Sequence, residues 1–238
     1  MARFTDKLAL VTGASRGIGR AVGKALAREG AHVILAARRE GSLEDIDDEI
    51  REAGGTATLV RLDLTAGDKI DALGPTIYER WGKLDILVAN AGILGPLSPL
   101  PHISEDAWNN VLAINLTANW RLIRTLDPLL RHAEAGRAAF VSSGAAAAKN
   151  AYWGPYAVSK AGLEALVKTY AHEIANTTVC ANLINPGPVR TEMRQQAFPG
   201  EDPKTLPPPE EIAEKFLDVV DPARTDNGRI FNFDQRPK

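Results

Sequence analysis

The sequence LALVTGASRGIGRAVGKALAR, residues 8–28, joins an apolar run to a longer amphipathic stretch through a turn that holds three glycines. The run over residues 8–11 is short and uniformly apolar, which is typical of a strand buried on both faces. Residues 17–28 have the length and periodicity of a helix. A buried strand, a tight turn and a helix in this order form the first half of a βαβ unit.

The same alternation continues along the chain. The further expected strands are residues 33–35, 58–60, 86–88, 139–141, 179–184 and 230–233, and the further expected helices are residues 42–53, 66–80, 104–131 and 155–175. Strands that alternate with helices of this length need crossover connections, which give a parallel sheet covered by helices on both faces. The sequence therefore predicts one doubly wound (Rossmann) α/β domain over residues 1–238, with a seven-stranded parallel sheet.

The composition is that of an ordinary globular protein, with 238 residues, 45% of them hydrophobic and 24% charged. The net charge of −2 provides no global positive field, so we expect no nucleic-acid or membrane partner. Cys180 is the only cysteine, and the four histidines lack metal-ligand spacing. No apolar run approaches the roughly 20 residues of a membrane span. We therefore expect a cytoplasmic protein without a metal.

Residues that commonly begin or end helices support the expected helix boundaries. Gly30 and Gly54 follow helical stretches at positions where a left-handed residue commonly ends a helix. Ser104 is placed to cap the N-terminus of the next long helix. Pro128 is expected to kink or end the helix over residues 104–131.

The turn after the first strand has the spacing Gly-x-x-x-Gly-x-Gly, with glycines at positions 13, 17 and 19. Glycines let the backbone approach a pyrophosphate closely, and the free N–H groups at the helix N-terminus favour its negative charge. The alternative is a strand-to-helix turn that merely needs glycine. The position directly after the first strand favours dinucleotide binding.

The second strand is followed by Arg38 and Arg39, about 20 residues after the glycines, where an NAD site places an Asp or Glu on the ribose hydroxyls. Arg38, together with Arg16 of the glycine turn, could instead neutralise a 2′-phosphate. We therefore expect NADP(H) rather than NAD(H). The alternatives are a pair of solvated arginines, or Glu40 as a ribose ligand.

Tyr156 and Lys160 stand four residues apart at the start of a helix and so share one face. A phenol with a pKa of about 10 is a poor base at neutral pH, and a nearby ammonium group favours the phenolate. Ser142 and Ser143 close the fifth strand, at the edge where doubly wound sheets bind ligands, and a hydroxyl there can donate to a carbonyl oxygen. Alternatively, the tyrosine and lysine are an exposed pair, and the serines bond to the backbone.

Together these motifs resemble the short-chain dehydrogenase/reductase family, and the resemblance covers essentially the whole chain. The further positions that carry it are Asp63, Asn90-Ala91-Gly92, Asn115 and Pro186-Gly187. The resemblance implies that Tyr156 is the acid/base and that Ser143, 13 residues before it, positions the substrate oxygen. It also implies that Lys160 holds the nicotinamide ribose and lowers the pKa of the tyrosine, while Asn115 supports a proton relay through water.

The same resemblance implies a set of cofactor-binding residues. These are Gly13, Ser15, Arg16, Gly17, Ile18, Gly19, Arg38, Asp63, Leu64, Asn90, Ala91, Gly92, Tyr156, Lys160, Pro186, Gly187, Val189 and Thr191. Among them Asp63 would contact the adenine and Thr191 the nicotinamide carboxamide. Two departures stand out: Ala89 replaces the first of a usual asparagine pair, and Asp234-Gln235 replaces the common Asp-Gly-Gly after the last strand.

The function expected from these residues is hydride transfer between a nicotinamide and a small carbonyl compound or secondary alcohol. A non-catalytic dinucleotide-binding sensor or scaffold is the main alternative, and an epimerase or dehydratase on the same scaffold is another. The resemblance further implies a homodimer or homotetramer in which the helices over residues 104–131 and 155–175 pair with their symmetry mates.

Residues 185–209 show neither a strand nor a helix pattern and contain seven of the 15 prolines. A long irregular segment inside a compact domain is usually functional. We expect residues 190–209 to form a lid that brings Met193, Ala197 and Phe198 over a moderately apolar substrate, and the alternative is a static surface connection. Further candidate walls of the substrate pocket are Leu94, Leu97, Ala145, Trp153 and Pro188.

Overall fold

The computed structural model describes residues 2–148 and 150–233. Within these residues seven strands form one parallel sheet in the order β3-β2-β1-β4-β5-β6-β7. The strands are β1 Leu8–Thr12, β2 His32–Ala37, β3 Thr56–Arg61, β4 Ile86–Ala89, β5 Arg137–Val141, β6 Cys180–Asn185 and β7 Ile230–Asn232. The order reverses between β1 and β4, as in doubly wound folds, and this confirms the predicted fold class.

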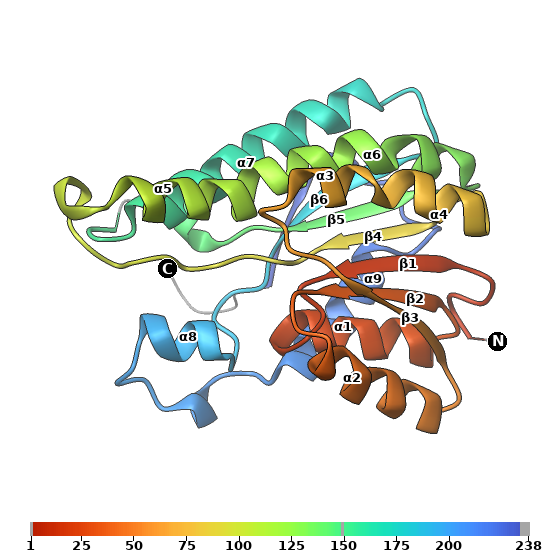
Figure 1. Ribbon diagram of the computed structural model, residues 1–238, viewed down its shortest axis with the longest axis horizontal. Helices are drawn as coiled ribbons and strands as arrows, with labels where there is room; N and C mark the ends of the chain where they lie inside the picture. Colours follow the sequence, from red (N-terminus) through yellow and green to blue (C-terminus); the bar gives the residue numbers. More distant parts are fainter. Residues whose placement is uncertain (1, 149, 234–238) are drawn as a thin grey trace.

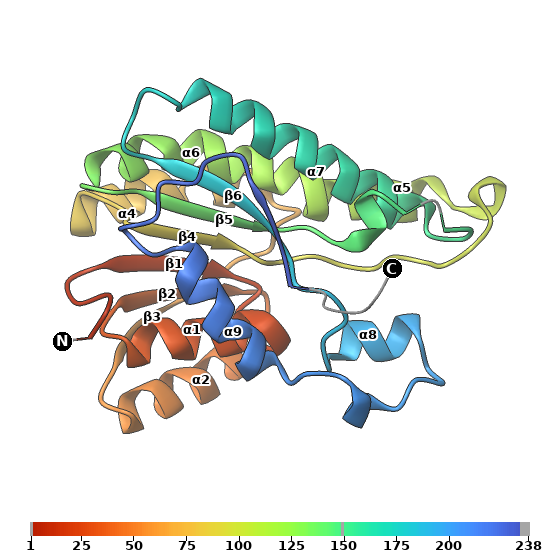
Figure 2. The same cartoon turned by 180° about the vertical axis from the view of Figure 1, so that it is seen from behind.

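Helices cover both faces of the sheet, as Figures 1 and 2 show. The helices are α1 Gly17–Arg28, α2 Gly41–Glu52, α3 Gly67–Asp71, α4 Leu73–Trp81, α5 Glu105–Leu112, α6 Ala118–His132, α7 Gly154–Glu173, α8 Glu192–Ala197 and α9 Pro209–Val219. One apolar cluster lies between the sheet and α1, α2 and α9, and the other lies under α3, α4, α6 and α7. The site is therefore carried by a sheet that is packed on both sides.

Each expected strand is present, with ends that differ from the prediction by at most two residues. Gly30 and Gly54 adopt positive φ angles after α1 and α2, and the Ser104 hydroxyl accepts a hydrogen bond from the Ala107 amide as the cap of α5. Two of the expected boundaries were wrong. The helix expected over residues 66–80 is divided into α3 and α4, and α8 occupies part of the segment for which no helix pattern was seen.

Pro128 was expected to kink or end its helix, and it does not end it, since α6 continues through it to His132. Proline removes one backbone hydrogen bond, but Leu129 and Leu130 in the following turn are buried in the core. Their burial outweighs the local loss and keeps the last turn helical. The stretch before α6 also differs from a plain helix, because Ala113–Thr117 forms a π-helical turn between α5 and α6.

Among the helices within residues 2–148 and 150–233, none has the length and apolar character needed to cross a bilayer. Asp234 and Gln235, which depart from the family pattern, lie outside the described residues.

Candidate active site

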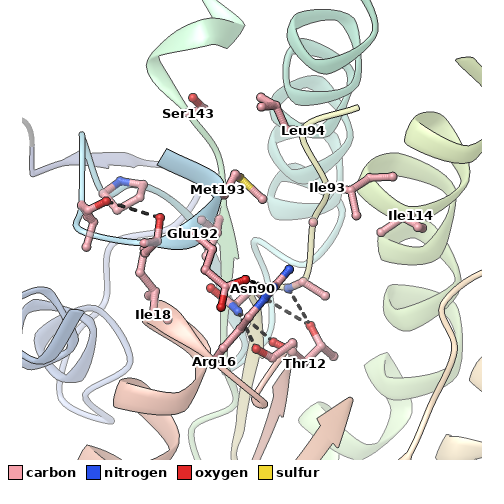
Figure 3. Close-up of a pocket in the computed structure, with 18 of the residues that line it drawn as sticks. Thr12, Arg16, Ile18, Asn90, Ile93, Leu94, Ile114, Ser143, Glu192 and Met193 are labelled. Atoms are coloured by element: carbon pink, nitrogen blue, oxygen red, sulfur yellow. Dashed lines mark hydrogen bonds and ion pairs between the residues drawn. The ribbon is translucent and has the colours of Figure 1, made fainter. Parts of the chain in front are cut away.

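A cavity of about 660 Å³ lies at the carboxyl edge of the sheet, around the point between β1 and β4 where the strand order reverses. Figure 3 shows Thr12 and Arg16 at one end of this cavity, and Ser143 and Leu94 at the other. All of the catalytic and cofactor-binding residues expected from the sequence line the cavity except two. Gly19 and Asn115 do not line it: Gly19 packs closely against Gly13, and the Asn115 side chain accepts a hydrogen bond from the Ile93 amide.

The glycine turn shapes the half of the cavity that the sequence predicts to bind a dinucleotide. Gly13 and Gly17 have φ angles of 66° and 54°, which residues other than glycine rarely adopt. A Cβ atom on Gly19 would lie only 2.4 Å from the Gly13 carbonyl oxygen, so α1 packs against its own turn there. The Thr12 hydroxyl accepts hydrogen bonds of 3.1 Å from the amides of Asn90 and Ala91, which joins the ends of β1 and β4.

The end of β2 presents basic and hydroxyl groups to the same half of the cavity. Arg38 and Ser42 line it, whereas Glu40 does not and instead begins α2 by accepting backbone hydrogen bonds. The Asp63 carboxylate accepts two hydrogen bonds from Thr65, and these bonds hold its pKa below the usual range. The other expected phosphate ligand, Arg16, forms an ion pair with a residue that sequence reasoning missed, Glu192 of α8.

The reactive groups lie where α7 begins beside the end of β5. The Ser143 hydroxyl lowers the pKa of the nearby Tyr156 phenol, but burial has the larger effect and raises that pKa above its ordinary value. Ser142 points elsewhere, because its hydroxyl donates a 2.7 Å hydrogen bond to Glu164. The geometry therefore pairs Tyr156 with Ser143 and not with its neighbour.

Lys160 is buried one turn further along α7. Its Nζ atom donates a 2.7 Å hydrogen bond to the Val141 carbonyl and lies 5.8 Å from the centre of the Tyr156 ring. Burial lowers the pKa of Lys160 to about 8. An ammonium group has three donors, so two remain for a ligand in the cavity that this side chain lines.

Asn115 lies in the π-helical turn between α5 and α6 and is fully buried. Its amide group accepts from the Ile93 amide and donates to the Ile93 carbonyl, both at 2.9 Å, and it also donates to the Ser159 hydroxyl at 3.0 Å. The side chain thus ties the loop after β4 to α7, next to Lys160.

The other end of the cavity is apolar and includes part of α8. Met193 and Ala197 line it, as expected from the sequence, and Figure 3 shows Met193 pointing toward the centre. Phe198 does not line the cavity and packs against Trp153 from outside, because α8 ends before it. Leu97 is 36% exposed and is not part of the wall either.

The residues that sequence reasoning missed differ in whether a local sequence pattern could have identified them. Ser42 stands in the first turn of the helix after β2, a position that could have been singled out beside Arg38. The pairing of Arg16 with Glu192 joins residues 176 apart in the chain, and no local pattern signals it.

Comparison with known proteins places this cavity in a family. Residues 7–202 match the family model described as short chain dehydrogenase. The chain belongs to the short-chain dehydrogenase/reductase family. It is an NAD(P)-dependent oxidoreductase, which favours the enzymatic expectation over a sensor or scaffold.

Three relatives illustrate the similarity. The chain is 36% identical to the oxidoreductase YciK of Escherichia coli K12 over 233 residues, which cover 96% of this chain and 92% of that one. It is 38% identical to the 3-oxoacyl-[acyl-carrier-protein] reductase FabG of Vibrio harveyi over 188 residues, or 79% and 75% of the two chains. A short chain dehydrogenase from Shigella flexneri 2a strain 301, solved as a complex with NADP, has a TM-score of 0.93 and 36% identity over 98% of both chains.

Proposed function

We propose that this dehydrogenase uses NADP(H) to interconvert a carbonyl compound and the corresponding alcohol, with Tyr156 as the acid/base. The observation that carries the proposal is that Tyr156 and Ser143 both line the cavity and interact with one another, with the buried Lys160 beside the tyrosine ring. This arrangement supports a reaction that uses one proton donor, one hydroxyl to position the substrate oxygen and one cation.

The dinucleotide half has the features that a pyrophosphate-containing cofactor needs. A cradle of glycines with positive φ opens onto the N-terminus of α1, where free N–H groups favour negative charge. The cofactor, when bound, supplies the hydride for reduction and accepts it in oxidation. Arg38 follows β2 and Ser42 lies in the first turn of α2, where a 2′-phosphate would meet a charged fork and a hydroxyl. These groups support NADP(H) over NAD(H).

The reaction half supports a division of labour between its residues. Because burial raises its pKa, the Tyr156 phenol is protonated at neutral pH and can give its proton to a carbonyl oxygen as that oxygen gains charge. The Ser143 hydroxyl can donate to the same oxygen and hold it in place. Lys160 binds the Val141 carbonyl and keeps two donors for the nicotinamide ribose, and its charge favours the phenolate once the proton has left.

Replacing Tyr156 by phenylalanine tests the acid/base role. Tyr156→Phe keeps the ring but removes the proton, so turnover should fall by a factor on the order of 100 or more while cofactor affinity stays nearly unchanged. Turnover is followed by the absorbance of NADPH with a panel of carbonyl compounds, and affinity by calorimetry. Tyr152→Phe is the matched control, since Tyr152 is 59% exposed and does not line the cavity. Wild-type turnover in Tyr156→Phe would show the assignment to be wrong.

We also propose that residues 190–209 act as a lid. Met193 and Ala197 line the cavity from α8, and Figure 1 shows α8 beyond the carboxyl edge of the sheet. Amides of this segment should exchange hydrogen quickly in the free protein and become protected when NADP and substrate bind. Strong protection that does not change on binding would identify a static connection instead.

The expected homodimer or homotetramer stays a prediction. Trp120 of α6 and Val158 of α7 are 43% and 45% exposed, so both helices carry large apolar side chains toward solvent. Such side chains are compatible with the pairing of these helices between subunits.

A further inference from the structure

The substrate end of the cavity has an apolar wall made by two parts of the chain that are distant in sequence. Leu94, Ala145 and Tyr156 form a small buried cluster there. Trp153, before α7, and Met193, on α8, pack against that cluster and also line the cavity. When the carbonyl oxygen of a substrate reaches Tyr156, a group attached to its carbonyl carbon therefore contacts Trp153.

The backbone holds Trp153 in a fixed place beside the reactive tyrosine. Trp153 precedes Tyr156 by three residues at the N-terminus of α7, and the two ring centres are 5.9 Å apart in an edge-on arrangement. Tyr152 just before it has a φ of 73°, an unusual conformation for a side chain of this size. Its carbonyl accepts a 3.1 Å hydrogen bond from the Ser98 amide. The backbone that carries the indole is therefore constrained.

The outer side of the indole is supported by a stack of side chains from the lid segment. The Phe198 ring centre lies 5.7 Å from that of Trp153, and the guanidinium carbon of Arg194 lies 3.7 Å from the centre of the Phe198 ring. Glu201 holds Arg194 with a hydrogen bond of 2.6 Å between Oε1 and Nη2. We call Trp153, Phe198, Arg194 and Glu201 the aromatic stack, and it fixes the wall from behind.

The aromatic stack also determines the charge that this end of the cavity offers. Arg194 lines the cavity, yet its guanidinium is engaged by Glu201 and by the Phe198 ring. A substrate carboxylate beside Trp153 would have to compete with Glu201 for that cation while losing its own hydration among apolar side chains. A neutral substituent faces no such penalty.

We infer that Trp153 determines the substrate class of the proposed reaction: a neutral ketone or aldehyde with a flat apolar substituent, an aryl ring above all, that lies against the indole. The inference rests on the proposed function, because Tyr156 defines where the carbonyl sits. Aromatic rings favour stacking or edge contacts with one another over contacts with saturated rings of similar size.

Three methyl ketones test the inference with the full chain and NADPH. Acetophenone carries the flat neutral ring, cyclohexyl methyl ketone replaces it with a puckered ring, and 4-acetylbenzoate adds a carboxylate. We expect kcat/KM for acetophenone to exceed that for cyclohexyl methyl ketone roughly 5-fold, and that for 4-acetylbenzoate at least about 10-fold. Equal values, or a preference for the carboxylate, would overturn the inference.

Two variants show whether Trp153 is the cause. Trp153→Ala should bring the ratio of acetophenone to cyclohexyl methyl ketone close to 1, mainly through KM, while Trp153→Phe should retain most of it. Phe198→Ala leaves the lining residues unchanged but removes the ring that supports the indole and contacts Arg194, so it should lower the ratio in part. This variant also serves if Trp153→Ala does not fold, and an unchanged ratio in it would then count against the inference.

Binding measured beside turnover separates this inference from the proposed function. Calorimetry with the NADP-saturated protein gives the affinity for each ketone in the wild type and in the variants. Ketone binding that depends on Trp153 without any turnover would sink the proposed reaction and leave the binding preference standing. Turnover with no dependence on Trp153 or Phe198 would support the proposed reaction and overturn the role of Trp153 in substrate choice. If the ketones show neither binding nor turnover, both the reaction and the substrate preference are rejected.

Discussion

The two ends of the cavity differ in whether backbone or buried side chains form them. The dinucleotide end is shaped by the backbone around Gly13 and Gly17, and its charged side chains are largely in solvent: those of Arg16 and Glu192 are 60% and 62% exposed. At the reaction end the key side chains are inside the protein, with Lys160 and Tyr156 exposed by only 3% and 8%. Substitutions at the first end should therefore change cofactor affinity and choice, whereas those at the second should change chemistry and folding stability together.

Lys160 should show the largest coupling of activity and stability. Burial lowers its pKa to about 8 from an ordinary value of 10.5, so below pH 8 the folded protein keeps a charge that the unfolded chain would hydrate better. The folded pKa lies below the unfolded one, so the unfolded state binds more protons between about pH 8 and 10.5, and stability rises with pH across that window. Lys160→Met removes this penalty.

At pH 7 we expect Lys160→Met to raise the free energy of unfolding by about 1 to 3 kcal/mol, and to reduce turnover by a factor on the order of 100. Urea unfolding at several pH values should show the difference from wild type shrinking as the pH rises toward 10. Lys168→Met on the same helix is the matched control, since its side chain is 47% exposed. A less stable variant at pH 7, or a difference independent of pH, would contradict the burial argument.

Arg38→Asp should have an intermediate effect, confined to cofactor choice. Arg38 is exposed at the end of β2 and lines the dinucleotide end, so reversing its charge removes a partner for a 2′-phosphate and offers a carboxylate to ribose hydroxyls. The ratio of kcat/KM for NADPH over NADH should fall by about 10-fold to 100-fold. Arg61→Asp makes the same charge change at the end of β3, outside the cavity wall, and should leave the ratio unchanged. An unaltered ratio in Arg38→Asp would place the 2′-phosphate elsewhere.

Sequence reasoning succeeded for structural relations between residues that are close together in the chain. The strand, turn and helix around Gly13 to Gly19 follow from local pattern, and so does the placement of Tyr156 and Lys160 on one helix face. The choice of Ser143 over Ser142 rested on the family's spacing, and the hydrogen bond of Ser142 to Glu164 gives it a physical reason. These are short-range relations, which periodicity and spacing can express.

Sequence reasoning failed where contacts join residues far apart in the chain or where packing overrides local helix preference. Phe198 was expected over the substrate, but the end of α8 turns it onto Trp153 instead. Pro128 was expected to kink or end its helix, but the helix continues past it through buried leucines. The link from Arg16 to Glu192 depends on where α8 comes to lie, which only the folded chain determines.

The link from Arg16 to Glu192 provides the smallest expected effect and the sharpest test of the contrast between the two ends. Both side chains are mostly in solvent, so the pair itself should contribute at most about 1 kcal/mol. Glu192→Gln removes the carboxylate that competes with a 2′-phosphate for Arg16, so the dissociation constant of NADPH should fall roughly 2-fold to 5-fold while that of NADH stays unchanged. Glu211→Gln in α9, also exposed and outside the cavity wall, is the control. If both cofactors bind more weakly to Glu192→Gln by the same factor, the pair serves to hold α8 over the cavity and not to tune the choice of cofactor.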